Sequence, residues 1–142
     1  MYEPIRGGSR RSVPSAMAGT PQDFPHRTRE EELDIQLAGH LAALLAVTDE
    51  LRAAAPSADL DTAAERLAEQ VARLRGRVPA RASATTTGHE PNAVALHRRA
   101  HALAGRALVV AASRADTAAA ILAAERMDAH TAALRQRELA SR

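Results

Sequence analysis

The sequence predicts an all-α protein, and three observations support this prediction. Ala, Leu and Arg are abundant, and these residues are strong helix formers. Aromatic residues, which favour strands, are nearly absent: the chain has one Phe, one Tyr and no Trp. Apolar residues also recur at three- and four-residue steps, which is the helical period. A chain of 142 residues suits one domain, so we expect a helical bundle made of an N-terminal antiparallel hairpin and a long C-terminal helix.

Residues 1–27 are predicted to form a flexible, basic tail. Four Pro and three Gly interrupt this stretch, and no apolar period runs through it. Its charged residues are mainly arginines: Arg6, Arg10, Arg11 and Arg27, against Glu3 and Asp23. The single helical domain is therefore expected to span residues 28–142.

The first helix is predicted over residues 29–54. Thr28 and Glu31 have the spacing of a capping box, in which each side chain bonds the backbone N–H of the other residue. Pro56 ends the segment. The residues expected to form the buried face are Leu33, Leu37, Leu41, Leu44, Thr48 and Leu51.

The second helix is predicted over residues 58–77, starting near Ser57 or Asp59. Gly76 and Pro79 mark its end. The link through Pro56 is short, so the first two helices should form an antiparallel hairpin. A linker rich in Pro, Gly, Ser and Thr is expected over residues 79–91. The predicted seam of the helix is Leu60, Ala64, Leu67, Val71, Leu74 and Val78.

The third helical segment covers residues 92–140 and allows two interpretations. It contains no Pro, and Gly105 is its only Gly, which favours one continuous helix. In the alternative, the helix breaks near residues 113–116, where Ser113 and Asp116 have capping-box spacing, and the chain forms four helices. An apolar stripe running in phase through Thr117, Ile121 and Ala124 favours continuity.

A continuous helix would be longer than the hairpin beside it and would carry two apolar faces. We therefore expect a homodimer or a helical protein partner to cover the excess apolar surface. The predicted interaction residues are Leu96, Leu103, Val110, Ile121, Val109, Met127 and Leu134.

The distribution of charge suggests how the helices pack. Residues 30–55 hold six acids against Arg52, whereas residues 91–142 hold eight arginines against four acids. An acidic first helix and a basic third segment are complementary neighbours. The chain has no Lys, which agrees with a GC-rich coding sequence as well as with selection for Arg at a phosphate-binding surface.

Histidines provide the best candidate for a chemical site. His97 and His101 are four residues apart, so they share one helix face and could chelate Zn or Ni. A hairpin at residue 115, or an antiparallel dimer crossing there, would bring His130 close to His101. Arg98 and Arg99 oppose a dication at this position. Boundary histidines without a metal are the simpler interpretation.

These patterns favour a non-enzymatic bundle that acts through protein–protein interaction or self-association, without a cofactor. A bundle that binds a metal or small ligand through its histidines is the alternative. A regulator that contacts nucleic acid through Arg98, Arg99, Arg106, Arg114 and Arg126 is a second alternative, which we expect less because no aromatic residues interleave for base stacking. No segment approaches the roughly 20 apolar residues of a membrane span, so a cytoplasmic location is expected.

Overall fold

A computed structural model describes residues 27–81 and 92–141, and these residues form a helical bundle. In order, the helices are α1 (Arg29–Ala54), α2 (Ala58–Arg75), α3 (Ala93–Arg114) and α4 (Thr117–Ala140). The described residues contain no strand. The all-α fold and the N-terminal hairpin are thus confirmed. The tail predicted over residues 1–27 and the linker over 79–91 lie largely outside the described residues.

The boundaries of α1 and α2 follow from their capping residues. The backbone N–H of Glu31 donates to Thr28 Oγ1 at 3.0 Å, and the backbone N–H of Thr28 donates to Glu31 Oε1 at 2.8 Å. This is the predicted capping box, and α1 has the predicted bounds. Ser57 caps α2, and Gly76 ends it in the left-handed conformation with φ 75°. The helix ends two residues before the predicted limit, so Val78 lies beyond it and is exposed.

The continuous helix over residues 92–140 is wrong, because the chain reverses at Ala115 and Asp116. Ala115 has φ 58° and is the only non-Gly residue with positive φ in the described chain. Its N–H donates to the carbonyl of Ala112, and the N–H of Asp116 donates to the carbonyl of Ala111. These two bonds define a Schellman motif. The side chain of Asp116 then accepts from the N–H of Ala119 and caps α4.

The reversal also changes which residues of the last segment are buried. The predicted stripe placed Ile121 and Ala124 inward, but Ile121 is exposed and Ala124 is half-buried. The periodicity of one helix predicts which residues of the next segment are buried only if both segments share one straight axis. The residues of α4 that are buried are Ala119, Leu122, Ala123, Arg126 and His130.

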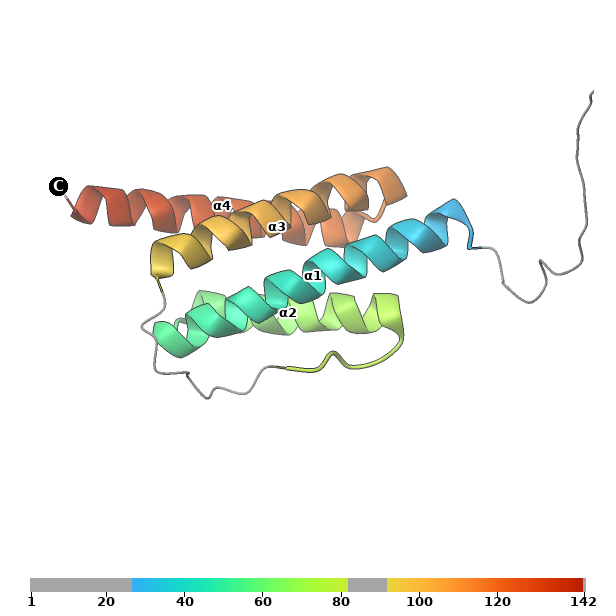
Figure 1. Cartoon of the computed structure of the whole chain (residues 1–142), viewed down its shortest axis with the longest axis horizontal. Coiled ribbons are helices and arrows are strands. Elements are labelled where there is room, and N and C mark those ends of the chain that lie inside the picture. Colours follow the sequence, from blue (N-terminus) through green and yellow to red (C-terminus); the bar gives the residue numbers. More distant parts are fainter. Residues whose placement is uncertain (1–26, 82–91, 142) are drawn as a thin grey trace, which may run out of the picture.

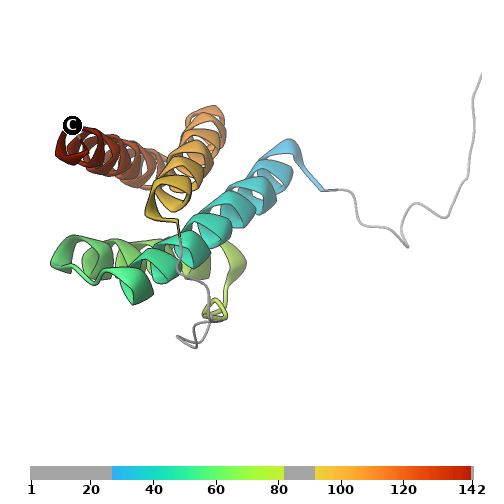
Figure 2. The ribbon, with the colours of Figure 1, turned by 60° about the vertical axis from the view of Figure 1, so that its left-hand side comes forward.

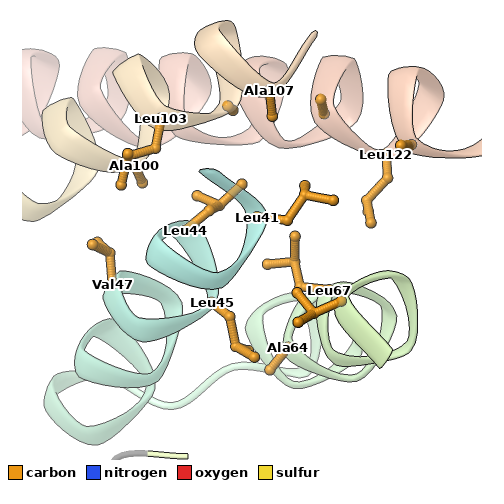
Figure 3. Close-up of a cluster of buried hydrophobic side chains, with 14 of the residues drawn as sticks. Leu41, Leu44, Leu45, Val47, Ala64, Leu67, Ala100, Leu103, Ala107 and Leu122 are labelled. Carbon is orange, nitrogen blue, oxygen red and sulfur yellow. The ribbon is translucent and has the colours of Figure 1, made fainter. Parts of the chain in front are cut away.

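Helix α1 is the centre of the bundle: it packs against both α2 and α3, while α4 packs mainly against α3. Figure 1 shows the four helices running roughly along one long direction, and Figure 2 shows the α3–α4 hairpin on one side of the α1–α2 hairpin. The core is made of Leu side chains from α1 and α2 facing mostly Ala from α3 and α4 (Figure 3). None of the described helices is long and apolar enough to cross a membrane.

The contact between α2 and α4 is sparse, and ion pairs bridge it. They are Arg66–Glu125 at 3.7 Å, Arg73–Asp116 at 2.7 Å and Arg126–Asp59 at 3.2 Å. On the opposite side of the bundle, Arg114 of α3 pairs with Asp34 of α1 at 3.1 Å. This last pair agrees with the complementary charge predicted for these segments.

Candidate functional site

A cleft of about 970 Å³ opens at one end of the bundle, where α1 ends and both α2 and α3 begin. The C-terminal half of α4 forms its other wall. Figure 1 shows these helix ends gathered at the left of the molecule, near the C-terminus. The lining residues are Leu51, Ala53, Ala54, Ala55, Ser57, Asp59, Leu60, Ala93, His97, Arg126, Ala129, His130, Ala133, Gln136, Arg137 and Ala140.

Small side chains explain why this end of the bundle is hollow. Seven of the lining residues are alanines, contributed by α1, α3 and α4 and by the α1–α2 link. The α1–α2 link turns within Ala55, Pro56 and Ser57, where the Ser57 hydroxyl caps α2 by accepting from the N–H of Leu60. Methyl groups on both walls leave the space that larger apolar residues fill elsewhere in the core.

His97 and His130 meet at the wall of the cleft. Their Nδ1 atoms are 2.9 Å apart, and their ring centroids are separated by 5.1 Å. At this distance one Nδ1 carries the hydrogen and the other accepts it. His130 is 1% exposed and His97 is half-buried. The pair therefore joins α3 to α4 by a polar contact in an otherwise apolar seam.

Burial keeps both imidazoles neutral. Loss of solvent, helped by the positive charge of Arg126, lowers the pKa of His130 to about 3. Loss of solvent also lowers the pKa of His97, with Arg137 and Arg126 acting in the same direction. Two neutral rings can share one hydrogen, whereas a doubly protonated pair could not. The electrostatics and the geometry therefore agree.

Arg126 is the most unusual residue of the cleft, because an arginine is 4% exposed in a small bundle. Its Nη1 donates to the carboxylate of Asp59, at 3.3 Å to Oδ1 and 3.2 Å to Oδ2. The Asp59 side chain is 67% exposed, so its negative charge is largely solvated by water. Among the described residues, Arg126 Nε, Arg126 Nη2 and His130 Nε2 are buried without a hydrogen-bond partner.

The structure brings together two of the three predicted metal ligands. The hairpin alternative correctly places His130 beside α3, but the ring that it contacts is His97, one turn before His101. In the described part of the chain, no three His, Cys, Asp or Glu side chains are grouped so as to hold a metal ion. The positive charge of Arg126 acts on both histidines and opposes a cation at this position.

The predicted interaction residues divide into two sets. Leu103 belongs to the core, and Leu96, Val110 and Met127 pack against it. These four contact the chain's own helices. Leu134 is half-buried, and the two that remain exposed are Val109 at 67% and Ile121 at 55%.

The candidate nucleic-acid arginines are similarly divided. Arg114 pairs with Asp34, and Arg126 is buried beside Asp59. Arg98, Arg99 and Arg106 are exposed on α3. The predicted basic surface of α3 and α4 is therefore reduced to one helix.

The sequence did not predict that Arg126 and His130 are buried at the wall of the cleft. From the sequence, Arg126 was considered only as one of five arginines that could contact nucleic acid. Two signals were available: Arg126 and His130 are four residues apart, and both are in phase with Leu122 and Ala119. A buried Arg–His pair on that line becomes visible only once the helix is broken at residue 115.

Comparison with protein-family models, with curated proteins and with solved structures finds no match to this chain.

Proposed function

We propose that this chain is a non-enzymatic binding protein whose ligand occupies the cleft at the open end of the bundle. The observation that supports this proposal is the combination of a large cleft, an alanine-rich wall and two buried polar side chains, Arg126 and His130, on its surface. Ligand sites are typically mostly apolar, with a few placed polar groups, and reach about 1,000 Å³. The same combination costs stability when the cleft is empty, because buried polar groups are left without partners.

The side chains of the cleft favour binding over catalysis. Among the described residues, Ser57 is the only one in the lining with a hydroxyl, and its oxygen is used to cap α2. The imidazoles bond each other instead of a nucleophile. Asp59 is the only carboxylate among the described lining residues, so the paired acid and base of a hydrolytic site are not found among them.

A fragment screen by protein-observed NMR tests the proposal. Fragments of anionic, cationic and neutral classes would be added to the labelled full chain, and amide shifts would be mapped onto the helices. We expect hits whose shifts cluster around the cleft. Ala133→Phe, which fills the cleft, should abolish them, whereas Ala132→Phe on the exposed side of α4 should not. Hits that are absent, or that persist unchanged in Ala133→Phe, would overturn the proposal.

Self-association is a second candidate function, supported by the exposure of Val109 and Ile121. The overhang of one long helix, which predicted a dimer, does not exist because the chain reverses at Ala115. Light scattering at micromolar concentration tests what remains: a dimer that dissociates in Val109→Ser/Ile121→Ser supports self-association, and a monomer rejects it.

A Zn or Ni site is not part of the proposal. Among the described residues only two imidazoles converge, and the positive charge of Arg126 acts on both. The expected cytoplasmic location remains a prediction of the same proposal, which a fractionation experiment would test.

A further inference from the structure

We propose that the cleft binds a monocarboxylate with an apolar body, whose carboxylate replaces Asp59 at the guanidinium of Arg126. This inference rests on the proposed function and specifies the class of ligand. Two N–H groups of Arg126 are buried next to the cleft without a partner among the described residues.

The charge of the cleft indicates an anion. Among the described lining residues, Arg126 and Arg137 supply two positive charges, and Asp59 supplies one negative charge. The lining therefore has an excess of one cation, while both histidines are neutral. A ligand with a single negative charge balances this excess, whereas a phosphate dianion would overcompensate it. A cationic ligand would meet a repulsive wall.

The geometry of Arg126 indicates a planar anion. A guanidinium offers its donors as a fork that matches the two oxygens of a carboxylate. In this structure only Nη1 is bonded, and its two contacts, at 3.2 and 3.3 Å, are long for a charge-assisted bond. Nε and Nη2 remain unpaired. A ligand carboxylate on Nε and Nη2 would form the bidentate pair that Asp59 does not form.

His130 can strengthen the same contact. When its Nδ1 accepts the hydrogen from His97, the hydrogen of His130 resides on Nε2, which is buried and unpaired. That N–H is then a buried donor just beneath the cleft wall, on the same helix as Arg126 and four residues along. Neighbours at this spacing lie on one face of a helix, so both can address one ligand.

The rest of the wall suits an apolar body. Apart from the charged residues, the cleft is lined mainly by alanine methyl groups and by Leu51 and Leu60. These surfaces stabilise a hydrocarbon chain or ring by removing it from water. To admit the carboxylate, the guanidinium releases Asp59 and turns, because Nε and Nη2 are buried in this structure and must be brought to the cleft surface. The charge of Asp59 then faces solvent at little cost because it is already largely exposed.

Titration calorimetry with a matched set of eight-carbon ligands tests the inference on the full chain. The probes are octanoate, octyl phosphate, octanol and octylamine. We expect octanoate to bind most tightly. Arg126→Met should weaken it about tenfold or more, as expected for losing hydrogen bonds to a charged group. Arg106→Met, which removes an exposed arginine of α3 outside the cleft, should leave the affinity unchanged.

Asp59→Asn distinguishes ligand binding by Arg126 from a purely structural role, because a structural role would not change the affinity for octanoate in this variant. Removing the competing carboxylate should raise the affinity for octanoate several-fold. Circular dichroism confirms that each variant is folded, and Arg126→Lys supplies a second variant that keeps the charge but loses the fork. Affinity for octanoate that is equal in Arg126→Met and in the wild type overturns the inference.

The failure of this inference can be told from the failure of the proposed function. If octanol or octylamine binds at the cleft as tightly as octanoate, the cleft is a binding site, but not one for carboxylates. The same conclusion holds if octyl phosphate binds more tightly. If neither this set nor the fragment screen perturbs the cleft, both proposals are rejected.

Discussion

Replacing Ala115 by Gly should stabilise the protein, because Ala115 occupies the left-handed conformation without the freedom of glycine. A Cβ in that conformation costs about 1–2 kcal/mol. The gain is reduced by the greater entropy of the unfolded chain with Gly, worth about 0.4–1 kcal/mol. Ala115 is exposed, so losing its methyl group removes no core packing. We therefore expect a net stabilisation of about 0.5–1 kcal/mol.

Thermal and urea unfolding monitored by circular dichroism would measure this change. At roughly 4 °C per kcal/mol for a chain of this size, the melting temperature should rise by about 2–4 °C. Two control variants are expected to lower the free energy of unfolding instead of raising it. Ala112→Gly lies inside α3 on an exposed position and should destabilise by about 1 kcal/mol. Gly76→Ala at φ 75°, where a Cβ would meet open space, should also destabilise by about 1 kcal/mol.

The result that refutes the reasoning is a loss of stability in Ala115→Gly that matches the loss in Ala112→Gly. Both alanines would then be inside one helix, and the long continuous helix would be restored, together with the case for a dimer. The sign of one ΔΔG therefore distinguishes the two architectures that the sequence left open.

Three further predictions concern the core, the cap of α4 and the buried imidazole. Leu41→Ala, at a fully buried position, should cost about 3–4 kcal/mol in urea unfolding, whereas Ile121→Ala should cost under about 1 kcal/mol; similar losses would contradict the packing. Asp116→Ala removes the cap of α4 and an ion pair to α2 and should cost about 1–2 kcal/mol, while Asp116→Ser should recover most of the loss. Because burial lowers the pKa of His130 to about 3, the folded protein resists its protonation. The stability that neutral His130 provides to the fold is fully present above about pH 6.5. As pH falls toward 3, the free energy of unfolding decreases by up to about 1.4 kcal/mol per pH unit, because the unfolded chain binds a proton that the folded chain does not. Urea unfolding between pH 7 and 4.5 should show a shallower dependence in His130→Gln, and identical slopes would disprove the assignment.

Local signals in the sequence were sufficient for the first two helices. The capping box at Thr28, the cap at Ser57 and the glycine at Gly76 each act within one turn, so sequence reasoning located them. The Leu seam of α1 was equally visible, because those side chains face the same core along an unbroken axis.

The reversal at Ala115 could not be read in the same way. Its backbone conformation is one that Gly normally supplies, and the sequence has Ala there. The two bonds of the Schellman motif and the packing of α4 against α3 hold it in place. Tertiary contacts thus determine a local conformation that the residue type does not favour. The pairing of His130 with His97 and the burial of Arg126 depend on that reversal, so sequence reasoning missed them as well.

The ion pairs between α2 and α4 make one seam of the molecule sensitive to ionic strength. Elsewhere the helices are joined mainly by apolar packing, which salt does not screen, but here exposed pairs such as Arg66–Glu125 carry much of the contact. Exposed pairs contribute under about 1 kcal/mol each and weaken as the Debye length shortens. The seam between α2 and α4 should therefore loosen at high salt, while the apolar packing of α1 against α3 keeps the two hairpins together. Since the Arg126–Asp59 pair lies on the same seam, ionic strength should also affect the ion pair at the wall of the cleft.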